Sequence, residues 1–275
     1  METENQSDAL PIFRDARGLE IFHYDAAETK FVYKEIFEDR VYFRHGITLA
    51  KGNCAWDIGA NIGLFTLFVQ ENFEGIQIHA FEPSPRIYQI LAANTERYGQ
   101  RVITHRCGIA GQEREAAFTF YPRYSIMSGF HAQNELDGRT LRAGILGQWR
   151  QRYPNKPDLE DRFLDDMVDS ALGQKQEYVC SLRTISQLIR ETGTQRIDLL
   201  KIDAEGCELD ILRGIGDEHW PVIRQMVMEI HDGDGNVTAP IIEILESRGF
   251  QTVVEQEAGL TGSGVVNCYA LRSST

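Results

Sequence analysis

Asp57-Ile58-Gly59-Ala60-Asn61-Ile62-Gly63, preceded by the short apolar run Cys54-Ala55-Trp56, is the stretch that decides the fold. The pattern predicts a buried strand that turns sharply into a helix beginning at Ile62. Glycines allow backbone angles and close approaches that a side chain would forbid, and the first N–H groups of a helix are free to bind a ligand. A nucleotide-like ligand is therefore expected against this turn.

The glycine spacing argues against two common nucleotide-binding loops. A dinucleotide fingerprint requires G-x-G-x-x-G, but the two positions that should follow Gly59 as glycines hold Asn61 and Leu64. A phosphate-binding loop requires a lysine, and no lysine or arginine lies between Lys51 and Arg86. The turn therefore has no cation to neutralise a phosphate.

Two carboxylates are expected at the same crevice instead. Asp57 ends the first strand, and Glu82 follows the next predicted strand, 76–81. A carboxylate attracts an ammonium or sulfonium group and accepts hydrogen bonds from ribose hydroxyls. S-adenosylmethionine carries these groups and no phosphate, so it is the favoured ligand. The alternatives are a helix cap for Asp57 and a solvated strand end for Glu82.

Composition restricts the class of protein. The chain has 275 residues, enough for one sizeable α/β domain, and a single domain over residues 1–275 is expected. Its 41 acidic and 28 basic side chains give a net charge of −13, which disfavours nucleic acid and anionic membranes as partners.

Targeting signals and cysteine spacing point to a cytoplasmic protein. The first residues contain no apolar signal region, and no run approaches the roughly 18 apolar residues of a membrane span. The five cysteines never form a C-x-x-C pair, which predicts reduced thiols and no zinc site. They are Cys54, Cys107, Cys180, Cys207 and Cys268.

Strands and helices alternate along most of the chain, which predicts a parallel sheet. In the first half, helices are expected over 62–72 and 85–98 and strands over 76–81 and 102–107. In the second half, strands are expected over 197–203 and 226–230 and helices over 209–212 and 241–247. Segments 251–254 and 267–271, separated by the glycine-rich 259–264, predict an antiparallel hairpin that closes the sheet.

Two segments lie outside this alternation. Residues 1–50 contain scattered apolar side chains and are expected to form an N-terminal cover, a helix and a hairpin over the strand ends. Residues 122–176 interrupt the chain between predicted strands 116–121 and 177–182 and are expected to form an inserted, largely helical lid. An insertion at the ligand-binding end commonly shapes a site; the alternative is a surface excursion without function.

Three motifs carry a resemblance to a known family. They are the turn 57–63, Ala80-Phe81-Glu82-Pro83, and the run 197–208 (IDLLKIDAEGCE) followed by Leu212-Arg213-Gly214. Over roughly residues 53–121 and 177–272 the chain resembles class I S-adenosylmethionine-dependent methyltransferases, specifically the FkbM type. The resemblance implies a Rossmann-like α/β fold with a seven-stranded, mostly parallel sheet. It leaves the N-terminal cover and the insertion unmatched, where acceptor choice would reside.

The resemblance also implies roles for the turn and the strand ends. Glu82 would accept the ribose hydroxyls and Ser84 would support the ribose or adenine, while Gly108, within Cys107-Gly108-Ile109, would flank the adenine. The loop around the methionine part of the cofactor would consist of Asp57, Gly59, Asn61 and Gly63.

Methyl transfer to a hydroxyl is an in-line displacement that also needs a proton acceptor. Such a group should lie at the carboxyl ends of the later strands. His231 is the best candidate base, because imidazole titrates near neutral pH and a carboxylate, Glu205 or Glu229, can fix its tautomer. The alternative is a histidine with only a structural hydrogen bond.

Asp203 has two possible roles. It could bind the ammonium side of the cofactor, or it could join Glu229 and His231 in holding a divalent cation that acidifies the acceptor hydroxyl. The metal-bound form is the less supported, so no metal is predicted. Lys201, inside the same strand, is expected to pair with Glu229 on the neighbouring strand in a structural contact.

Two features near the insertion concern the acceptor. The loop 124–130 combines hydroxyl and apolar groups and could close over the ligands; the alternative is an ordinary connection. The insertion also carries several arginines beside Trp149, which could receive an acidic acyl carrier protein; the alternative is a solvated amphipathic helix. These arginines are Arg139, Arg142, Arg150 and Arg152.

The sequence thus predicts an S-adenosylmethionine-dependent O-methyltransferase. Its acceptor would be a hydroxyl of a polyketide-like or carbohydrate-containing metabolite, free or tethered to a carrier protein; the hydroxyl assignment depends on the resemblance. Two alternatives stay open, an NAD-dependent oxidoreductase and a catalytically silent domain that binds the cofactor as a scaffold.

Overall fold

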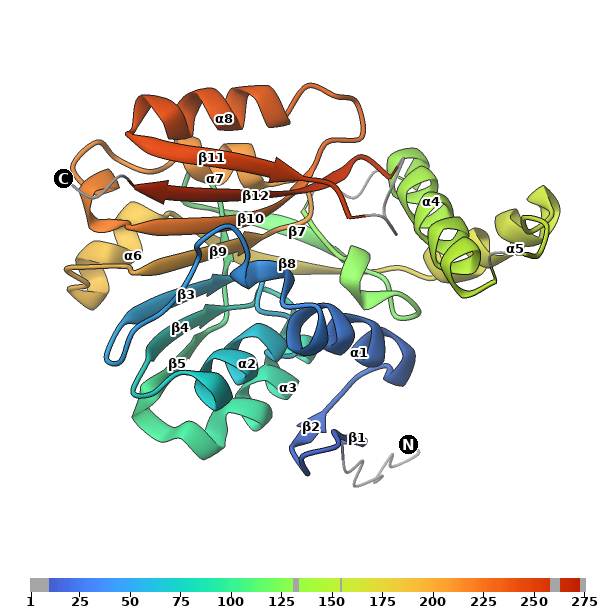
Figure 1. Cartoon of the computed structure of the whole chain (residues 1–275), viewed down its shortest axis with the longest axis horizontal. Coiled ribbons are helices and arrows are strands. Elements are labelled where there is room, and N and C mark those ends of the chain that lie inside the picture. Colours follow the sequence, from blue (N-terminus) through green and yellow to red (C-terminus); the bar gives the residue numbers. More distant parts are fainter. Residues whose placement is uncertain (1–9, 131–133, 154, 258–262, 273–275) are drawn as a thin grey trace.

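The computed structural model describes residues 10–130, 134–153, 155–257 and 263–272. At its centre lies a seven-stranded sheet of order β11-β12-β10-β9-β3-β4-β5 (Figure 1). The strands are β3 (Cys54–Ile58), β4 (Gln77–Phe81), β5 (Val102–His105), β9 (Leu199–Asp203), β10 (Gln225–His231), β11 (Phe250–Glu255) and β12 (Val265–Arg272). The predicted Rossmann-like sheet is confirmed.

Strand direction also agrees with the prediction. The pairs β10–β9, β9–β3, β3–β4 and β4–β5 are parallel, whereas β12 runs antiparallel to both β10 and β11. The C-terminal hairpin therefore closes the sheet with its second strand placed inside it. Part of the glycine-rich turn expected at 259–264 lies outside the described residues.

Successive residues of the central strands face opposite layers, as a period of two requires. Ala55, Leu199 and Val227 pack with α2 (Leu64–Asn72) and α3 (Pro85–Thr95). Trp56, Leu200 and Met228 pack on the other face with α6 (Ile185–Thr192), α7 (Glu208–Arg213) and α8 (Thr238–Ser247). Covering both faces with helices leaves only the strand ends free to form a site.

Several element boundaries differ from the prediction. The first helix begins at Leu64, two residues later than expected, because Gly63 takes a left-handed φ of 93° and caps it. The helix expected over 85–98 ends at Thr95 and continues as a 3-10 segment, Glu96–Arg101. Strand β5 ends at His105, so the chain leaves the main sheet before Gly108.

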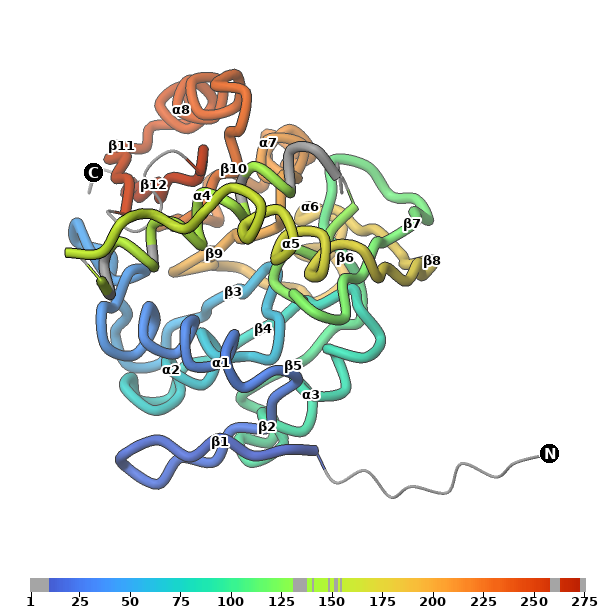
Figure 2. Tube along the Cα trace, turned by 90° about the vertical axis from the view of Figure 1, so that its right-hand side faces the viewer, coloured from blue at the N-terminus to red at the C-terminus, as the bar shows by residue number. Residues whose placement is uncertain are grey.

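A second, three-stranded sheet of order β6-β8-β7 follows that departure. It comprises β6 (Gly108–Ile109), β7 (Arg114–Phe120) and β8 (Gln176–Arg183). Between β7 and β8 lie the short η4 (Ser125–Met127) and two helices that pack together, α4 (Asn134–Arg152) and α5 (Asp161–Leu172), which pass in front of the main sheet in Figure 2. The expected insertion is therefore helical.

The N-terminal segment forms a hairpin and a helix. It comprises β1 (Ile12–Arg14), β2 (Glu20–Phe22), α1 (Ala26–Tyr33), the π-helical η1 (Lys34–Glu38) and the 3-10 turn η2 (Val41–Phe43). Phe37 joins it to α2 through an edge contact with Phe68, the ring centroids being 5.3 Å apart.

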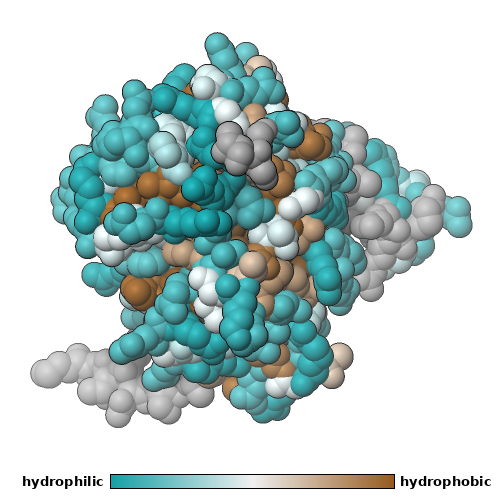
Figure 3. All heavy atoms as spheres, turned by 60° about the vertical axis from the view of Figure 1, so that its left-hand side comes forward, coloured by the Kyte–Doolittle hydropathy of each residue, from teal (hydrophilic) through white to brown (hydrophobic). Residues whose placement is uncertain are grey.

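The exposed surface is mostly polar. Figure 3 shows one face on which hydrophilic residues predominate, with smaller hydrophobic areas between them. Among the described residues, none of the helices is both long enough and apolar enough to cross a bilayer.

Candidate active site

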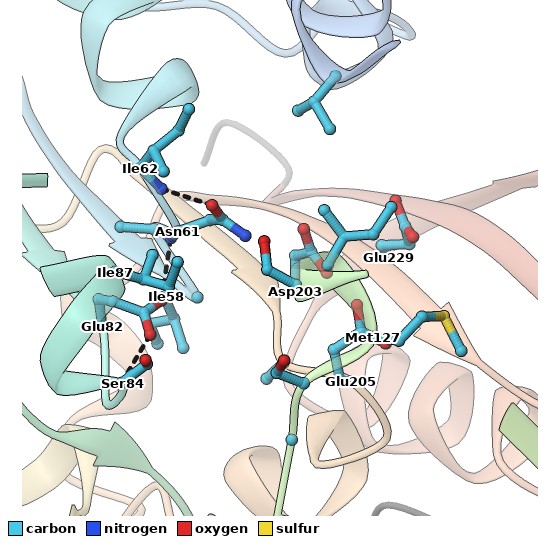
Figure 4. A pocket seen from close by; sticks show the side chains of 18 of the residues that line it. Ile58, Asn61, Ile62, Glu82, Ser84, Ile87, Met127, Asp203, Glu205 and Glu229 are labelled. Atoms are coloured by element: carbon cyan, nitrogen blue, oxygen red, sulfur yellow. Dashed lines mark hydrogen bonds between the residues drawn. The ribbon is translucent and has the colours of Figure 1, made fainter. Parts of the chain in front are cut away.

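The carboxyl ends of the parallel strands open into a pocket. Strand register places Lys201 beside Asp57 and Asp203 beside Glu229, so the strands end at a common level. Figure 4 shows two groups of side chains facing each other across this pocket. We call Gly59, Asn61, Glu82 and Ser84 the cofactor side, and Asp203, Glu205, Glu229 and His231 the acidic side; all eight line the pocket.

The backbone of the turn after β3 reaches into the pocket. Gly59 has a φ of 70°, and a Cβ there would lie 1.7 Å from the carbonyl oxygen of Asp203, so only glycine fits. Asn61 is left-handed as well, with a φ of 49°, and its N–H donates to Glu82 Oε2 at 3.1 Å. The turn therefore presents bare backbone to a ligand, as predicted.

Glu82 is buried rather than a solvated strand end, with 6% of its surface exposed. Its Oε1 accepts a hydrogen bond from the N–H of Ser84 at 2.8 Å. Burial raises the pKa of Glu82 to about 7, although the N–H groups of Ser84 and Asn61 oppose the shift. The hydroxyl of Ser84 is buried and has no hydrogen-bond partner in the part of the chain that the structure describes. A ligand with hydroxyl groups would form hydrogen bonds with both the carboxyl group of Glu82 and the hydroxyl of Ser84.

Two residues expected to touch the cofactor do not line the pocket. Asp57 is fully buried behind the turn, where Oδ2 accepts from the hydroxyl of Thr66 at 2.7 Å. Gly63 caps α2, and a Cβ there would lie 2.8 Å from a methyl group of Leu91. Any effect of these residues on a ligand in this pocket would be indirect, through the shape of the turn.

Lys201 connects the turn with the acidic side. Its buried Nζ lies 3.3 Å from Asp57 Oδ1 and 3.4 Å from Asp203 Oδ2, and it donates to the Gly59 carbonyl at 2.8 Å. The expected ion pair with Glu229 is wrong, because Asp57 and Asp203 lie closer. Burial lowers the pKa of Lys201, but these two carboxylates outweigh it and raise the pKa overall.

His231 lies among three carboxylates. Nε2 is 3.2 Å from Glu205 Oε2 and 3.6 Å from Glu229 Oε1, while Nδ1 is 3.1 Å from Glu208 Oε1. The structure thus brings together the three residues that the sequence selected for proton transfer. The carboxylate positioned to fix the tautomer is Glu208, not Glu205 or Glu229, because it faces Nδ1.

Glu208 is the residue that sequence reasoning missed. It is fully buried at the start of α7, and its Oε1 also accepts from the N–H groups of Gly206 at 3.0 Å and Ala204 at 3.3 Å. Glu208 is the last residue of the run 197–208 in the third motif, so the sequence contains it in plain view. No sequence pattern, however, shows in which direction the side chain of a glutamate in the first turn of a helix points.

The acidic side combines strain with perturbed protonation. Glu205 has a left-handed φ of 47°, unusual outside glycine and typical of functional turns. Burial raises the pKa of Glu229 to about 7, helped by Asp203, and raises that of Glu205 well above its ordinary value. Burial lowers the pKa of His231, but Glu205 and Glu208 outweigh it and leave that pKa well above its ordinary value.

One subset of the acidic side has the spacing of a cation site. Ligand atoms of Asp203, Glu205 and His231 lie within 4.8 Å of one another. From the sequence, the possible ligands of a divalent cation are Asp203, Glu229 and His231. In the structure, Glu205 rather than Glu229 has the spacing of a cation ligand with the other two. Asp203 is additionally 3.3 Å from the hydroxyl of Tyr42 in η2.

The rest of the pocket comes from the N-terminal segment and the insertion. Gly108 lines it, and a Cβ there would lie 2.5 Å from the ring of Phe130. The loop 124–130 also lines it and is bound to α1, because Ser125 donates through its N–H and its hydroxyl to Glu28, at 2.7 and 2.6 Å. These segments form the wall opposite the strand ends.

The arginines of the insertion do not form a free basic patch. Arg142 bonds to Asp161 and Asp165 of α5, and Arg150 bonds to Asp158 at 2.6 Å. Arg139 lies 4.0 Å from Asp234, and the side chain of Arg152 lies outside the described residues.

A model of the FkbM methyltransferase domain matches residues 57–252. The chain belongs to the FkbM methyltransferase family. It is 35% identical, over 98% of its length, to the 31-O-demethyl-FK506 methyltransferase FkbM of Streptomyces tacrolimicus, of which the match covers 99%. It is also 38% identical, over 89% of its length, to a segment covering 12% of the AMB antimetabolite synthetase AmbE of Pseudomonas aeruginosa. The chain is therefore a methyltransferase by family.

A solved structure of low sequence identity is also similar to this chain. The FkbM methyltransferase of Methylobacillus flagellatus KT is 14% identical, with a TM-score of 0.48, over 88% of this chain and 54% of that one. Membership of the FkbM family argues against the NAD-dependent oxidoreductase, because the glycine turn then belongs to a methyltransferase motif.

Proposed function

We propose that this chain is an S-adenosylmethionine-dependent O-methyltransferase that acts on a hydroxyl of a polyketide-like or carbohydrate-containing metabolite. The observation that carries the cofactor assignment is the pair Glu82 and Ser84. Both are buried in a pocket whose lysine, Lys201, is already paired with Asp57 and Asp203, and the Ser84 hydroxyl has no partner among the described residues.

The residues present fit this cofactor. Glu82 would accept the ribose hydroxyls, Ser84 would complete its hydrogen bond there, and the backbone at Gly59 and Asn61 would lie against the methionine part. Gly108 would leave room for the adenine, and Asp203 would face the ammonium group. Asp57 and Gly63 would support the turn from behind it. The bound cofactor would supply the methyl group as part of a sulfonium.

The acidic side would then accept the proton that the acceptor hydroxyl loses. The acceptor oxygen would receive the methyl group that the bound cofactor supplies, and His231 Nε2 would take the proton that the hydroxyl loses. Glu208 keeps the other proton on Nδ1, so that Nε2 faces the acceptor. Glu205 and Glu229 stabilise the imidazolium that results.

The high pKa of His231 restricts when it can act. In the empty pocket Glu205, Glu208 and Glu229 favour the protonated imidazole, and a protonated imidazole cannot accept a further proton. Positive charge entering the pocket opposes those carboxylates, so His231 would lose its extra proton when the ligands bind. The histidine would thus become a base only in the loaded site.

The match to a segment of AmbE supports a second form of this proposal, an acceptor tethered to a carrier protein. The ion pairs of Arg142 and Arg150 speak against docking on those side chains, since their charges are already neutralised.

Calorimetric titration with S-adenosylhomocysteine tests the proposal. We expect micromolar binding that is weakened at least about tenfold, or roughly 1.4 kcal/mol, by Glu82→Ala. Ser84→Ala should weaken it less, and Glu74→Gln, at an exposed ion pair, serves as the control. Binding of NADH in place of S-adenosylhomocysteine would contradict the assignment. Tight cofactor binding with no turnover of any hydroxylated acceptor would identify the silent scaffold.

A further inference from the structure

The pocket has one more carboxyl group that the reaction does not use. Glu35 belongs to η1, in the N-terminal segment, and lines the same pocket as Asp203 and Glu229. It lies outside residues 57–252, the part matched by the family model.

The pocket contains far more negative than positive groups. Two cationic side chains, Lys201 and His231, lie among nine carboxyl groups of the described residues that line the pocket or contact these two. The nine are Asp25, Glu28, Glu35, Asp57, Glu82, Asp203, Glu205, Glu208 and Glu229. Lys201 is held by Asp57 and Asp203, and His231 is shared among three glutamates, so neither can neutralise another group.

Glu35 pairs with neither of these two cations. It makes no hydrogen bond or ion pair with any of the described residues, whereas Glu28, one helical segment earlier, is bound twice by Ser125. Burial raises the pKa of Glu35 to about 9, and the charges of Glu229 and Asp203 add to the shift. A largely buried carboxyl without a partner is costly, and a cation beside it would remove that cost.

The surroundings of Glu35 also suit an organic cation. Phe31 and Tyr124 supply aromatic rings to the pocket, and Val32 and Met127 supply apolar surface. Ammonium groups are attracted to aromatic rings as well as to carboxylates. A carboxylate or phosphate on the acceptor would instead meet an excess of negative charge.

We propose that Glu35 recognises the acceptor by binding a protonated amine on it, so that the acceptor is a hydroxylated amine such as an amino sugar or amino alcohol. The inference rests on the proposed function, because it places the acceptor in the pocket beside His231. The amine at Glu35 would hold the acceptor while a hydroxyl group on the same molecule faces His231 Nε2.

Three sugars that differ in one charge test this proposal. Glucosamine, glucose and glucuronate carry a positive, neutral and negative group on similar rings at neutral pH. Their binding to protein saturated with S-adenosylhomocysteine can be measured by saturation-transfer NMR. We expect glucosamine to bind at least about tenfold more tightly than glucose, with glucuronate weakest.

Glu35→Gln keeps the shape of the side chain and removes its charge, and it should bring glucosamine and glucose within about twofold of each other. Glu38→Gln, an exposed position on the same short helix, should leave the preference unchanged. Equal binding of the three sugars, no binding of any, or a preference that survives Glu35→Gln would overturn the proposal.

Mn²⁺ provides the competing explanation for the negative charge. Displacement of glucosamine by Mn²⁺ to the same extent in wild type and Glu35→Gln would assign the charge to a metal site and also overturn the proposal. Failure of the wild type to bind S-adenosylhomocysteine would count against the proposed function, and that titration is made separately.

Discussion

Replacing Glu208 by glutamine should change the protonation of His231 without emptying the space that the side chain fills. The substitution removes a buried negative charge 3.1 Å from Nδ1. It keeps one oxygen that can still accept from the N–H groups of Gly206 and Ala204. The matched control is Glu205→Gln, which removes a charge 3.2 Å from the other ring nitrogen.

The size of the effect follows from the geometry. An opposite charge at hydrogen-bond distance shifts a pKa by about 1–3 units, and each unit corresponds to about 1.4 kcal/mol. Two of the three carboxylates remain beside the ring in either variant, so the lower half of that range is expected for one substitution. The pKa of His231 should fall by about 1–2 units in either variant.

The two variants should differ in the tautomer. Nitrogen NMR of protein labelled at histidine distinguishes a proton on Nδ1 from one on Nε2. Once His231 is neutral, wild type and Glu205→Gln should keep the proton on Nδ1, whereas Glu208→Gln should lose that preference. An unchanged tautomer and pKa in Glu208→Gln would refute the positioning role, because a purely structural glutamate would alter stability alone.

Three further predictions concern the turn and its support. Gly59→Ala should lower the free energy of unfolding by at least about 3 kcal/mol, because the new methyl group clashes with the Asp203 carbonyl and the left-handed backbone is strained. Gly18→Ala, with a φ of 86° but open space around it, should lower the free energy of unfolding by only about 1 kcal/mol, and thermal denaturation measures both. Affinity for S-adenosylhomocysteine should fall as the pH drops through about 7, because Glu82 then gains a proton and loses its charge as an acceptor; calorimetry in which Glu82→Gln shows the same pH dependence would contradict this. Lys201→Met should destabilise the fold by about 3–5 kcal/mol, since it leaves the buried Asp57 and the partly exposed Asp203 without their cation, and denaturant unfolding that shows less than about 1 kcal/mol would refute the pairing.

Much of the main sheet was predictable because its signals are local. The strands β3 and β9 are mostly apolar, as strands buried on both faces usually are, although each contains one charged residue between apolar ones, Asp57 and Lys201. The glycines after β3 mark a turn that other residues could not form. Helix ends were less predictable. The helix α2 begins only at Leu64 because Gly63 has a left-handed φ, and Leu91 leaves no room for a side chain at Gly63. Local pattern does not contain such contacts.

The candidate site was predictable in membership and less so in geometry. The principle that parallel strands present their carboxyl ends together brought Asp203, Glu205, Glu229 and His231 to one pocket. It did not show that Asp57 is buried behind the turn, nor that Lys201 prefers Asp57 and Asp203 to Glu229. Those outcomes depend on side-chain direction and on distances between segments far apart in the chain.

The sequence by itself determined which chemical groups follow each strand of the main sheet. A glycine turn follows the first strand, a glutamate follows the second, and acids with a histidine follow the later ones. It could do so because backbone conformation and hydrophobic period are properties of neighbouring residues. Only the tertiary structure decided that Glu208 faces His231 and that Glu35 reaches the pocket without a partner among the described residues. These outcomes depend on how α7 packs against β10 and how η1 packs against α2, and the balance of charge in a buried space exists only once those segments meet.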